Sequence, residues 1–350
     1  MGRHKAALAV FAGSALGAAA LAILAAGPGQ AQPPRLSFQV ATGATAGTYF
    51  PMGELIAGIV SHPPGLARCD ARAVCGPSGL IVSARTSDGA VANVLAVEAG
   101  QVDSAFSQAN VVADAVAGRG AFRKTGRLKH IRVIADLFPE TIQLVAAAKS
   151  PIRKVADLSG KRVSVGTDGS GASVVAREIL SAYRISERRL RLRHESYDVS
   201  ADLLQQGKID AFFFEGVTPS PLIHDLLARG AARLVPIDGK ARRRLLLHVP
   251  DLYADSISAG LYPHIDAIGT VSSRTLWVVK DTASPDIVYG ILRALFNPAN
   301  RVLLDAGPPA GRYIRLDDAA NGLTAPLHPG AERFYRETGK LPDPQPAQHH

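Results

Sequence analysis

The sequence is poor in sulfur. Its 350 residues include two Cys and two Met. Five residues separate Cys69 from Cys75 in the segment CDARAVC. A zinc site needs four ligands, and no cluster of histidines accompanies this pair, so metal binding is disfavoured. We expect a structural disulfide that closes a small surface loop, which requires an oxidising compartment.

Long apolar runs are missing beyond the N-terminus. After residue 31, none reaches the ~18 apolar residues that a membrane-spanning helix needs. The N-terminus has basic residues at 3–5, an apolar run at 6–26 and the small residue Ala31. This order is typical of a cleaved signal peptide, so we predict one at 1–31 and export to the periplasm. A retained membrane anchor is the alternative, and the absence of Cys near residue 31 argues against a lipoprotein.

Several catalytic and nucleotide-binding motifs are missing. The glycines of GTDGSGAS (166–173) lack the Lys of a Walker loop and the spacing of a dinucleotide fingerprint. There is no G-x-S-x-G elbow, H-E-x-x-H pair or EF-hand loop. The scattered His224, His248, His264 and His328 are expected at the surface or at helix ends. We expect no metal, no cofactor and no catalysis. An exported hydrolase using Ser170 is a minor alternative, because no base for it can be identified.

Acidic residues are fewer than basic residues. The chain has 39 Lys and Arg against 30 Asp and Glu, a formal net charge of +9. A basic exported protein suggests an anionic ligand or an acidic partner. The densest basic runs, 188–193 and 242–244, lack interleaved aromatic residues and match no nucleic-acid-binding motif. We expect solvated helix faces there and no nucleic-acid partner.

The chain length and the pattern of apolar residues predict the fold class. Roughly 320 residues remain after cleavage, which is long for one hydrophobic core and natural for two lobes. Short β-rich runs alternate with segments of helical spacing, which predicts an α/β fold with mostly parallel sheets flanked by helices. The predicted strands are 36–42, 80–86, 102–108, 131–137, 141–148, 161–167, 209–214 and 275–280. Helices are predicted within 55–60, 91–100, 174–183, 222–227 and 287–296, the last with Ser284 as N-cap.

Four strand-to-helix loops are rich in Gly, Thr and Ser. They are 41–51, 85–93, 166–173 and 214–221. A helix N-terminus has unpaired N–H groups and a partial positive charge, so such a loop can bind a carboxylate or phosphate without Lys or Arg. Ligands of α/β proteins collect at the carboxyl ends of strands. Together the loops predict an anion-binding cleft, although each alone could merely cap its helix.

Five segments resemble, in order, the TAXI-type solute-binding proteins. These are the periplasmic receptors of one class of tripartite ATP-independent (TRAP) transporters. TGATAGTYFP (42–51) is similar to the Gly-rich opening of that family. The other matching segments are SDGAVAN with EAGQVDSAFSQANV (87–93, 98–111), VADLSGKRVSVGTDGSG (155–171), DAFFFEGVTPSPLI (210–223) and LHPGAERFYRETG (327–339).

The resemblance implies a two-lobed, type II-like periplasmic-binding-protein fold with a ligand cleft between the lobes. Lobe I would comprise 33–141 and 270–340, and lobe II 142–269. The implied partners are TRAP membrane subunits, and the implied ligand is a small organic anion, an amino acid such as glutamate or another carboxylate. We expect a monomer with a disordered Pro- and Gln-rich tail at 341–350. A ligand-sensing protein that works without a transporter is an alternative function.

The matched positions give the candidate ligand-binding residues. Tyr49 would pack on the ligand or form a hydrogen bond with it. The alternative is that its ring only packs against Met52 and Leu55 as a hydrophobic staple. Gln108 would reach the cleft from the end of its strand. The candidates are Thr42, Gly43, Thr48, Tyr49, Ser87, Asn93, Gln108, Ser170, Gly171, Glu215 and Thr218.

Three acidic residues near the expected anion site depart from the family pattern. We interpret Asp88 and Asp168 as helix N-caps that face away from the cleft. Glu215 has no such role, and we hypothesise that it faces the cleft and pairs with a ligand ammonium group. That pairing would favour an amino acid over a simple dicarboxylate. Ala44 and Ala46 replace glycines that are common in the family, so the first loop is expected to be tighter or stiffer.

Overall fold

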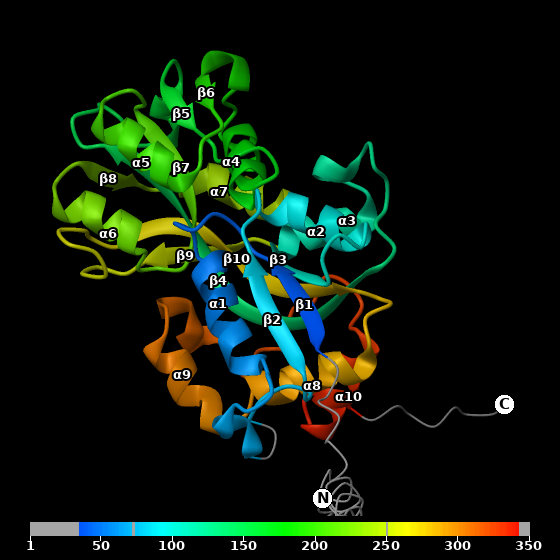
Figure 1. Cartoon of the computed structure of the whole chain (residues 1–350). Coiled ribbons are helices and arrows are strands. Elements are labelled where there is room, and N and C mark those ends of the chain that lie inside the picture. Colours follow the sequence, from blue (N-terminus) through cyan, green and yellow to red (C-terminus); the bar gives the residue numbers. More distant parts are fainter. Residues whose placement is uncertain (1–34, 72–73, 250, 343–350) are drawn as a thin grey trace, which may run out of the picture. The chain divides into compact units, whose positions relative to one another are not determined.

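A mixed β-sheet forms the framework of the protein (Figure 1). The computed structural model describes residues 35–71, 74–249 and 251–342, which pack as one unit. The predicted signal peptide, 1–31, lies outside the described residues. So do residues 33–34 of the predicted lobe I and residues 343–350 of the predicted tail.

The strands lie in the order β2-β1-β3-β10-β4-β7-β5-β6, with β8 beside β4 and β9 beside β10. Parallel pairs lie toward both ends of this order, β1 with β2 and β3 and β5 with β6 and β7. Strands β4 and β10 run antiparallel to every neighbour. The strand bounds are β1 Leu36–Ala41, β2 Leu80–Arg85, β3 Ser104–Gln108, β4 Ile131–Ala147, β5 Arg162–Ser164, β6 Arg191–Arg193, β7 Ala211–Gly216, β8 Ala232–Val235, β9 Tyr253–Ile257 and β10 Ile268–Lys280.

The long strand β4 corrects two sequence predictions. It runs without a break through Pro139, where two separate strands were predicted. Pro lacks an N–H group and interrupts a ladder only locally, and β10 stays paired with Pro139 and Glu140 through Arg274 and Ser273. Because β4 and β10 are antiparallel to their neighbours, the sheet is mixed rather than mostly parallel.

Helices cover the sheet on either side of β4 and β10 (Figure 1). The predicted helices are present, and α3, α5, α7, α9 and α10 are additional. The α-helix bounds are α1 Tyr49–Val60, α2 Ala90–Glu98, α3 Ala109–Ala117, α4 Gly171–Ala182, α5 Tyr197–Gln205, α6 Pro221–Ala228, α7 Gly239–His248, α8 Pro285–Leu295, α9 Arg301–Ala306 and α10 Pro329–Glu337. Ser284 is the N-cap residue of α8, although its side chain makes no capping hydrogen bond.

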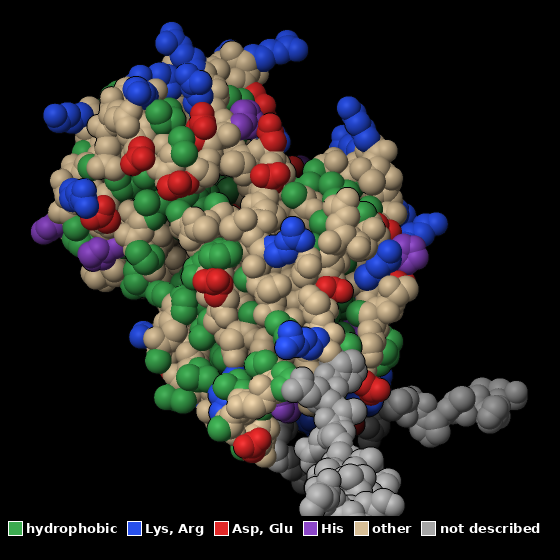
Figure 2. Space-filling view, in the orientation of Figure 1, with side chains coloured by type: hydrophobic (Ala, Val, Ile, Leu, Met, Phe, Trp, Pro, Cys, Tyr) green, Lys and Arg blue, Asp and Glu red, His purple; other side chains and the backbone are tan. Residues whose placement is uncertain are grey.

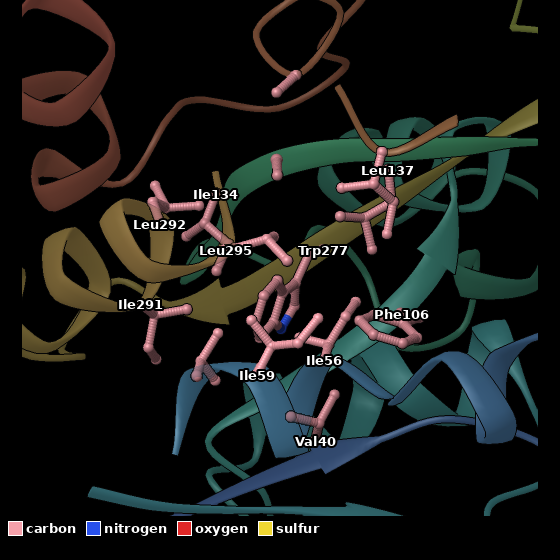
Figure 3. Packing of buried hydrophobic residues seen from close by; sticks show 14 of the residues in the cluster. Val40, Ile56, Ile59, Phe106, Ile134, Leu137, Trp277, Ile291, Leu292 and Leu295 are labelled. Carbon is pink, nitrogen blue, oxygen red and sulfur yellow. The ribbon is translucent and has the colours of Figure 1, made fainter. Parts of the chain in front are cut away.

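The hydrophobic clusters form two groups toward the two ends of the sheet, and we call these regions lobe I and lobe II after the predicted lobes. In lobe I, Trp277 is fully buried and lies among Ile56, Ile59 and Leu295 (Figure 3). Each buried aliphatic side chain of this kind stabilises the fold by about 1.5–3 kcal/mol relative to exposure. In lobe II, the clusters form around β5, β7 and β8 and include the second half of β4, from Ile142 onward. Strand β4 therefore contributes to both lobes.

The predicted disulfide is confirmed. Cys69 and Cys75 are bonded, with their Cα atoms 5.2 Å apart. None of the helices in the described part combines the length and apolar character that crossing a bilayer requires.

The two basic runs lie on solvated helix faces only in part. Arg188 and Arg189 are exposed on a short 3-10 helix. Arg191 and Arg193 belong to the short strand β6, where both side chains are exposed. Figure 2 shows Lys and Arg side chains gathered at the end that carries β5 and β6. The run at 242–244 does lie on a helix, α7, but Arg242 donates to the carbonyl oxygens of Asp255 and Thr270. Part of this positive charge therefore contacts backbone carbonyl groups of β9 and β10.

Candidate ligand-binding site

A cavity of about 180 Å³ lies between the two lobes. Pockets that hold drug-sized ligands measure about 300–1,000 Å³, so this smaller cavity suits a small metabolite. Four helices begin at its wall: α1 and α2 from lobe I, and α4 and α5 from lobe II. The lining residues are Gly43, Ala44, Gly47, Thr48, Tyr49, Ser87, Asp88, Gly89, Ala90, Gln108, Glu140, Thr167, Ser170, Gly171, Glu195, Ser196, Tyr197 and Glu215.

Three of the four predicted helix starts lie at this cavity. The fourth, in the 214–221 loop, does not. The 214–221 loop contributes Glu215, but the start of its helix, Ser220 and Pro221, lines a separate cavity. The Ser220 N–H is held there by the Tyr262 hydroxyl oxygen at 2.8 Å. Helix α5 takes the fourth place, with Ser196 as its N-cap residue. Its loop contains no glycine, so the sequence pattern did not reveal it.

Hydrogen bonds join the two lobes at the rim of the cavity. The N–H groups of Val91 and Ala92, in the first turn of α2, donate to the Gly169 carbonyl at 2.9 and 3.3 Å. These two N–H groups are therefore already hydrogen-bonded to the other lobe. The Val217 N–H donates to the Thr48 hydroxyl at 3.1 Å. These contacts connect the two lobes directly.

Two buried carboxyl groups face the cavity. Glu140 and Glu215 lie on the adjacent strands β4 and β7, and each is only 2% exposed. The Tyr49 and Thr275 hydroxyls donate to Glu140 Oε2 at 2.7 and 2.8 Å. The Ser273 hydroxyl donates to Glu215 Oε1 at 2.9 Å. Glu215 Oε2 has no hydrogen-bond partner among the described residues.

Burial shifts the titration of this pair. It raises the pKa of Glu140 to about 7, although hydrogen bonds from Tyr49 and Thr275 act in the opposite direction. Burial, and then the negative charge of Glu140, raise the pKa of Glu215 well above its ordinary value. The pKa of Tyr49 is also raised, by burial and then by the two carboxylates, so its hydroxyl stays protonated and donates. A site of this kind stabilises positive charge, because two carboxylates cannot both be ionised in it at low cost.

A model of the NMT1-like family matches residues 40–339. The chain belongs to this family. Among solved structures, MatC from Rhodopseudomonas palustris with bound malate is similar over 88% of this chain and 98% of its own, with 14% identity and a TM-score of 0.52. The periplasmic binding protein BugD is similar over 88% of this chain and 94% of its own, with 10% identity and a TM-score of 0.50. These likenesses confirm the predicted periplasmic-binding-protein fold.

Most of the predicted site residues of this NMT1-like chain line the cavity, and three do not. The structure brings Gly43, Thr48, Tyr49, Ser87, Gln108, Ser170, Gly171 and Glu215 together there. Thr42 and Asn93 lie behind its wall, fully buried. The Asn93 amide donates to the carbonyls of Thr42 and Phe106, both at 2.7 Å, so it ties β1 to β3. Thr218 follows the turn out of β7 and does not line the cavity.

The serines at the cavity wall are engaged by the backbone. The Ser170 hydroxyl accepts from the Ser173 N–H at 3.1 Å and donates to the Thr167 carbonyl at 2.7 Å. It is therefore a helix cap, which leaves it poorly suited to be a nucleophile. The Ser87 hydroxyl lies 2.6 Å from Asn93 Oδ1 and accepts from the Gly89 N–H.

The interpretation of Asp88 and Asp168 as N-caps is wrong. The N-cap residues of α2 and α4 are Gly89 and Ser170. Asp88 lies one residue too early and lines the cavity instead. The Asp168 carboxylate pairs with His194 at 3.0 Å and with Arg177 at 3.7 Å.

Sequence reasoning missed Glu140 and Tyr197. Glu140 and Asp136 are the two charged residues of a largely apolar segment, IADLFPETIQLVAAA, and this was the available signal. A charge in a run that is buried on both faces is costly and therefore points to a site. Tyr197 gave no comparable signal. It lies in the first turn of α5, and its hydroxyl donates to the Glu215 carbonyl at 3.2 Å.

No Lys, Arg or His lines the cavity in the part of the chain that the structure describes. The same residues contain no group of three His, Cys, Asp or Glu side chains arranged to hold a metal. Polar interactions with a bound molecule would therefore come from hydroxyls, amides, helix N-termini and carboxyl groups.

Proposed function

We propose that this chain is a periplasmic solute receptor of the TAXI type. It captures a small organic anion, an amino acid such as glutamate or another carboxylate, between its lobes and delivers it to a TRAP transporter driven by an ion gradient. The observation that carries the proposal is the cavity enclosed by helix starts from both lobes, α1 and α2 on one side and α4 and α5 on the other. The five segments that resemble TAXI proteins support the choice of subfamily.

The start of α4 is the proposed contact for the ligand carboxylate. Gly171 is the first residue of this helix, and its N–H group has no hydrogen-bond partner among the described residues. Glycine exposes the backbone, and the helix dipole favours a negative charge at this end. The absence of Lys and Arg from the wall is compatible with this mode of binding, because helix N-termini bind carboxylates by themselves.

Closure of two lobes over the solute is the proposed working motion. The proposed lobe bounds are 33–141 with 270–340, and 142–269. The start of the lobe II cluster at Ile142 supports the first boundary, whereas Val271 still belongs to that cluster. We infer that contacts such as that of the Val91 N–H with the Gly169 carbonyl form when the lobes close. A ligand that binds both lobes would shift the balance toward this state by its differential affinity. Export is supported by the predicted signal peptide and by the disulfide, which needs an oxidising compartment.

A thermal-shift screen of the mature protein with amino acids and organic acids tests this proposal. A ligand that binds only the folded protein stabilises it by about 4 kcal/mol at 1,000 times its Kd. We expect at least one solute to raise the Tm by several degrees and to reduce the radius of gyration in solution scattering. Uptake of that solute by proteoliposomes with TRAP membrane subunits should require this protein. The absence of any stabilising solute would contradict the receptor function.

A further inference from the structure

The two buried glutamates face the cavity from the same side of the sheet. Ile142 on β4 lies opposite Glu215 on β7, and Glu140 is two residues before Ile142. Residues two apart on a strand share a face, so the two carboxyl groups are diagonal neighbours. Glu215 Oε2 is buried at the cavity wall and lacks a partner among the described residues. A buried acceptor of this kind is unfavourable unless a bound molecule satisfies it.

Among the described residues that line the cavity, no side chain provides a positive charge to this pair. The titratable groups that face it from other elements are Tyr49 on α1, Tyr197 on α5, and Asp88 and Glu195 from the loops. Both tyrosine hydroxyls are held protonated by burial, which raises their pKa well above the ordinary value. The remaining two groups are acids. A cation that neutralises Glu140 or Glu215 must therefore come from the ligand.

We propose that Glu215 and Glu140 form an amine subsite, so that the ligand carries a primary ammonium group that donates to Glu215 Oε2. This inference rests on the proposed function and makes it more specific, since it selects amino acids and excludes their deaminated counterparts. It also adds Glu140, which holds the second negative charge within reach of the same group. The ligand carboxylate would lie at the Gly171 end of the cavity, in the opposite lobe from the Tyr49 hydroxyl that holds Glu140.

Amine binding at this subsite is linked to proton release. Without a cation, burial raises the pKa of both carboxyl groups, and the negative charge of Glu140 raises that of Glu215 further, so the pair retains a proton near neutral pH. A bound ammonium group favours the ionised carboxylates and expels that proton to the buffer. Affinity for an amine therefore rises between pH 6 and pH 8. A ligand without an amine would instead need the protonated acids as hydrogen-bond donors, and its affinity would fall over the same range.

The discriminating experiment compares amino acids with their 2-oxo acids. Suitable pairs are L-glutamate with 2-oxoglutarate, L-alanine with pyruvate and L-leucine with 2-oxoisocaproate, each titrated calorimetrically at pH 6 and pH 8. We expect the amino acid of the tightest pair to bind about 10- to 100-fold more strongly than its 2-oxo acid. Titration in two buffers of different ionisation enthalpy at pH 7 should show proton release for the amino acid.

The outcomes separate the two proposals. If the 2-oxo acid binds as tightly as the amino acid, or if affinity falls with pH, the amine subsite is wrong while the receptor function stands. If no member of any pair binds, the proposed function itself is contradicted, and the subsite with it.

Charge-neutral variants test the residues directly. Glu215→Gln and Glu140→Gln should each weaken amino-acid binding about 10- to 100-fold and reduce the proton release. Glu54→Gln is the matched control, because this exposed glutamate on α1 lies away from the cavity and its loss should change neither quantity. If the cavity variants fail to fold, the proton count of the unmodified protein still decides the question.

Discussion

Gly171, at the start of α4 in lobe II, lies directly against the Gln108 side-chain amide of lobe I, so that a methyl group on residue 171 would overlap Gln108 Oε1. Gln108 is buried at the end of β3, lines the cavity, and its Oε1 atom has no hydrogen-bond partner among the described residues. A side chain at residue 171 would therefore require the Gln108 amide to move toward the cavity.

Gly171→Ala should weaken ligand binding by hindering closure. Overpacking of this kind costs about 1–3 kcal/mol, which corresponds to roughly 5- to 150-fold in affinity. We expect a higher Kd by calorimetry and a larger radius of gyration in solution scattering. Gly58→Ala on α1 is the matched control, because nothing lies within 4 Å of its added methyl group. That control should stabilise the helix by about 0.5–1 kcal/mol and leave affinity unchanged. Unchanged affinity in both variants would show that closure does not depend on this contact.

The stability of the ligand-free protein should fall as pH rises from about 5 to 8. The pKa of Glu140 is raised by burial to about 7, against about 4.5 for an unperturbed glutamate. The native state therefore binds more protons than the unfolded chain in this range, and the stabilisation is lost as pH rises through the native pKa. The loss from Glu140 alone is on the order of 3 kcal/mol.

Urea unfolding at pH 5.5 and pH 8 measures this effect. Glu140→Gln should flatten the pH dependence, since the amide does not titrate. Asp136 also contributes, because burial raises its pKa to about 6. A wild-type protein that is more stable at pH 8 than at pH 5.5 would show that the acids in the cavity are not protonated as inferred.

The sequence predicted those parts of the site that depend on local chemistry. Gly, Thr and Ser at strand ends predicted the starts of α1, α2 and α4, because these residue types have specific backbone and capping preferences. Glu215 was singled out because it departs from the family pattern. Each of these signals is contained in one short segment of the sequence, so it can be recognised without knowing which distant segments pair.

The parts of the site that could not be predicted depend on pairing between strands that are distant in the sequence. Glu140 reaches the cavity because β4 continues past Pro139 and pairs with β7 and β10, which lie far away in the sequence. Tyr197 lines the cavity because α5 is packed against β7, although its own loop has no distinctive composition. The antiparallel direction of β4 likewise depends on strands more than sixty residues away. No local propensity encodes such relationships.

Asn93→Ala should reduce stability, whatever its effect on binding. The side chain is fully buried and donates to the carbonyls of Thr42 and Phe106, while its Oδ1 atom accepts from the Ser87 hydroxyl. Its removal leaves two buried carbonyls without these donors, at a cost of about 1–3 kcal/mol each. We expect the free energy of unfolding in urea to fall by about 2–4 kcal/mol. If stability is unchanged and only ligand affinity falls, Asn93 contacts the ligand directly, as the sequence analysis had predicted.

Removal of the disulfide should lower stability and leave binding unaffected. The Cys69–Cys75 bond closes a short loop, and a chain-entropy model assigns about 2 kcal/mol to a loop of this length. Neither cysteine lines the cavity, and the loop precedes β2 at the opposite end from Arg85, where the strand leads into the site. The Cys69→Ser/Cys75→Ser double variant should therefore show a lower Tm with an unchanged Kd. A large loss of affinity in this variant would mean that the loop supports the closed arrangement over the whole length of β2.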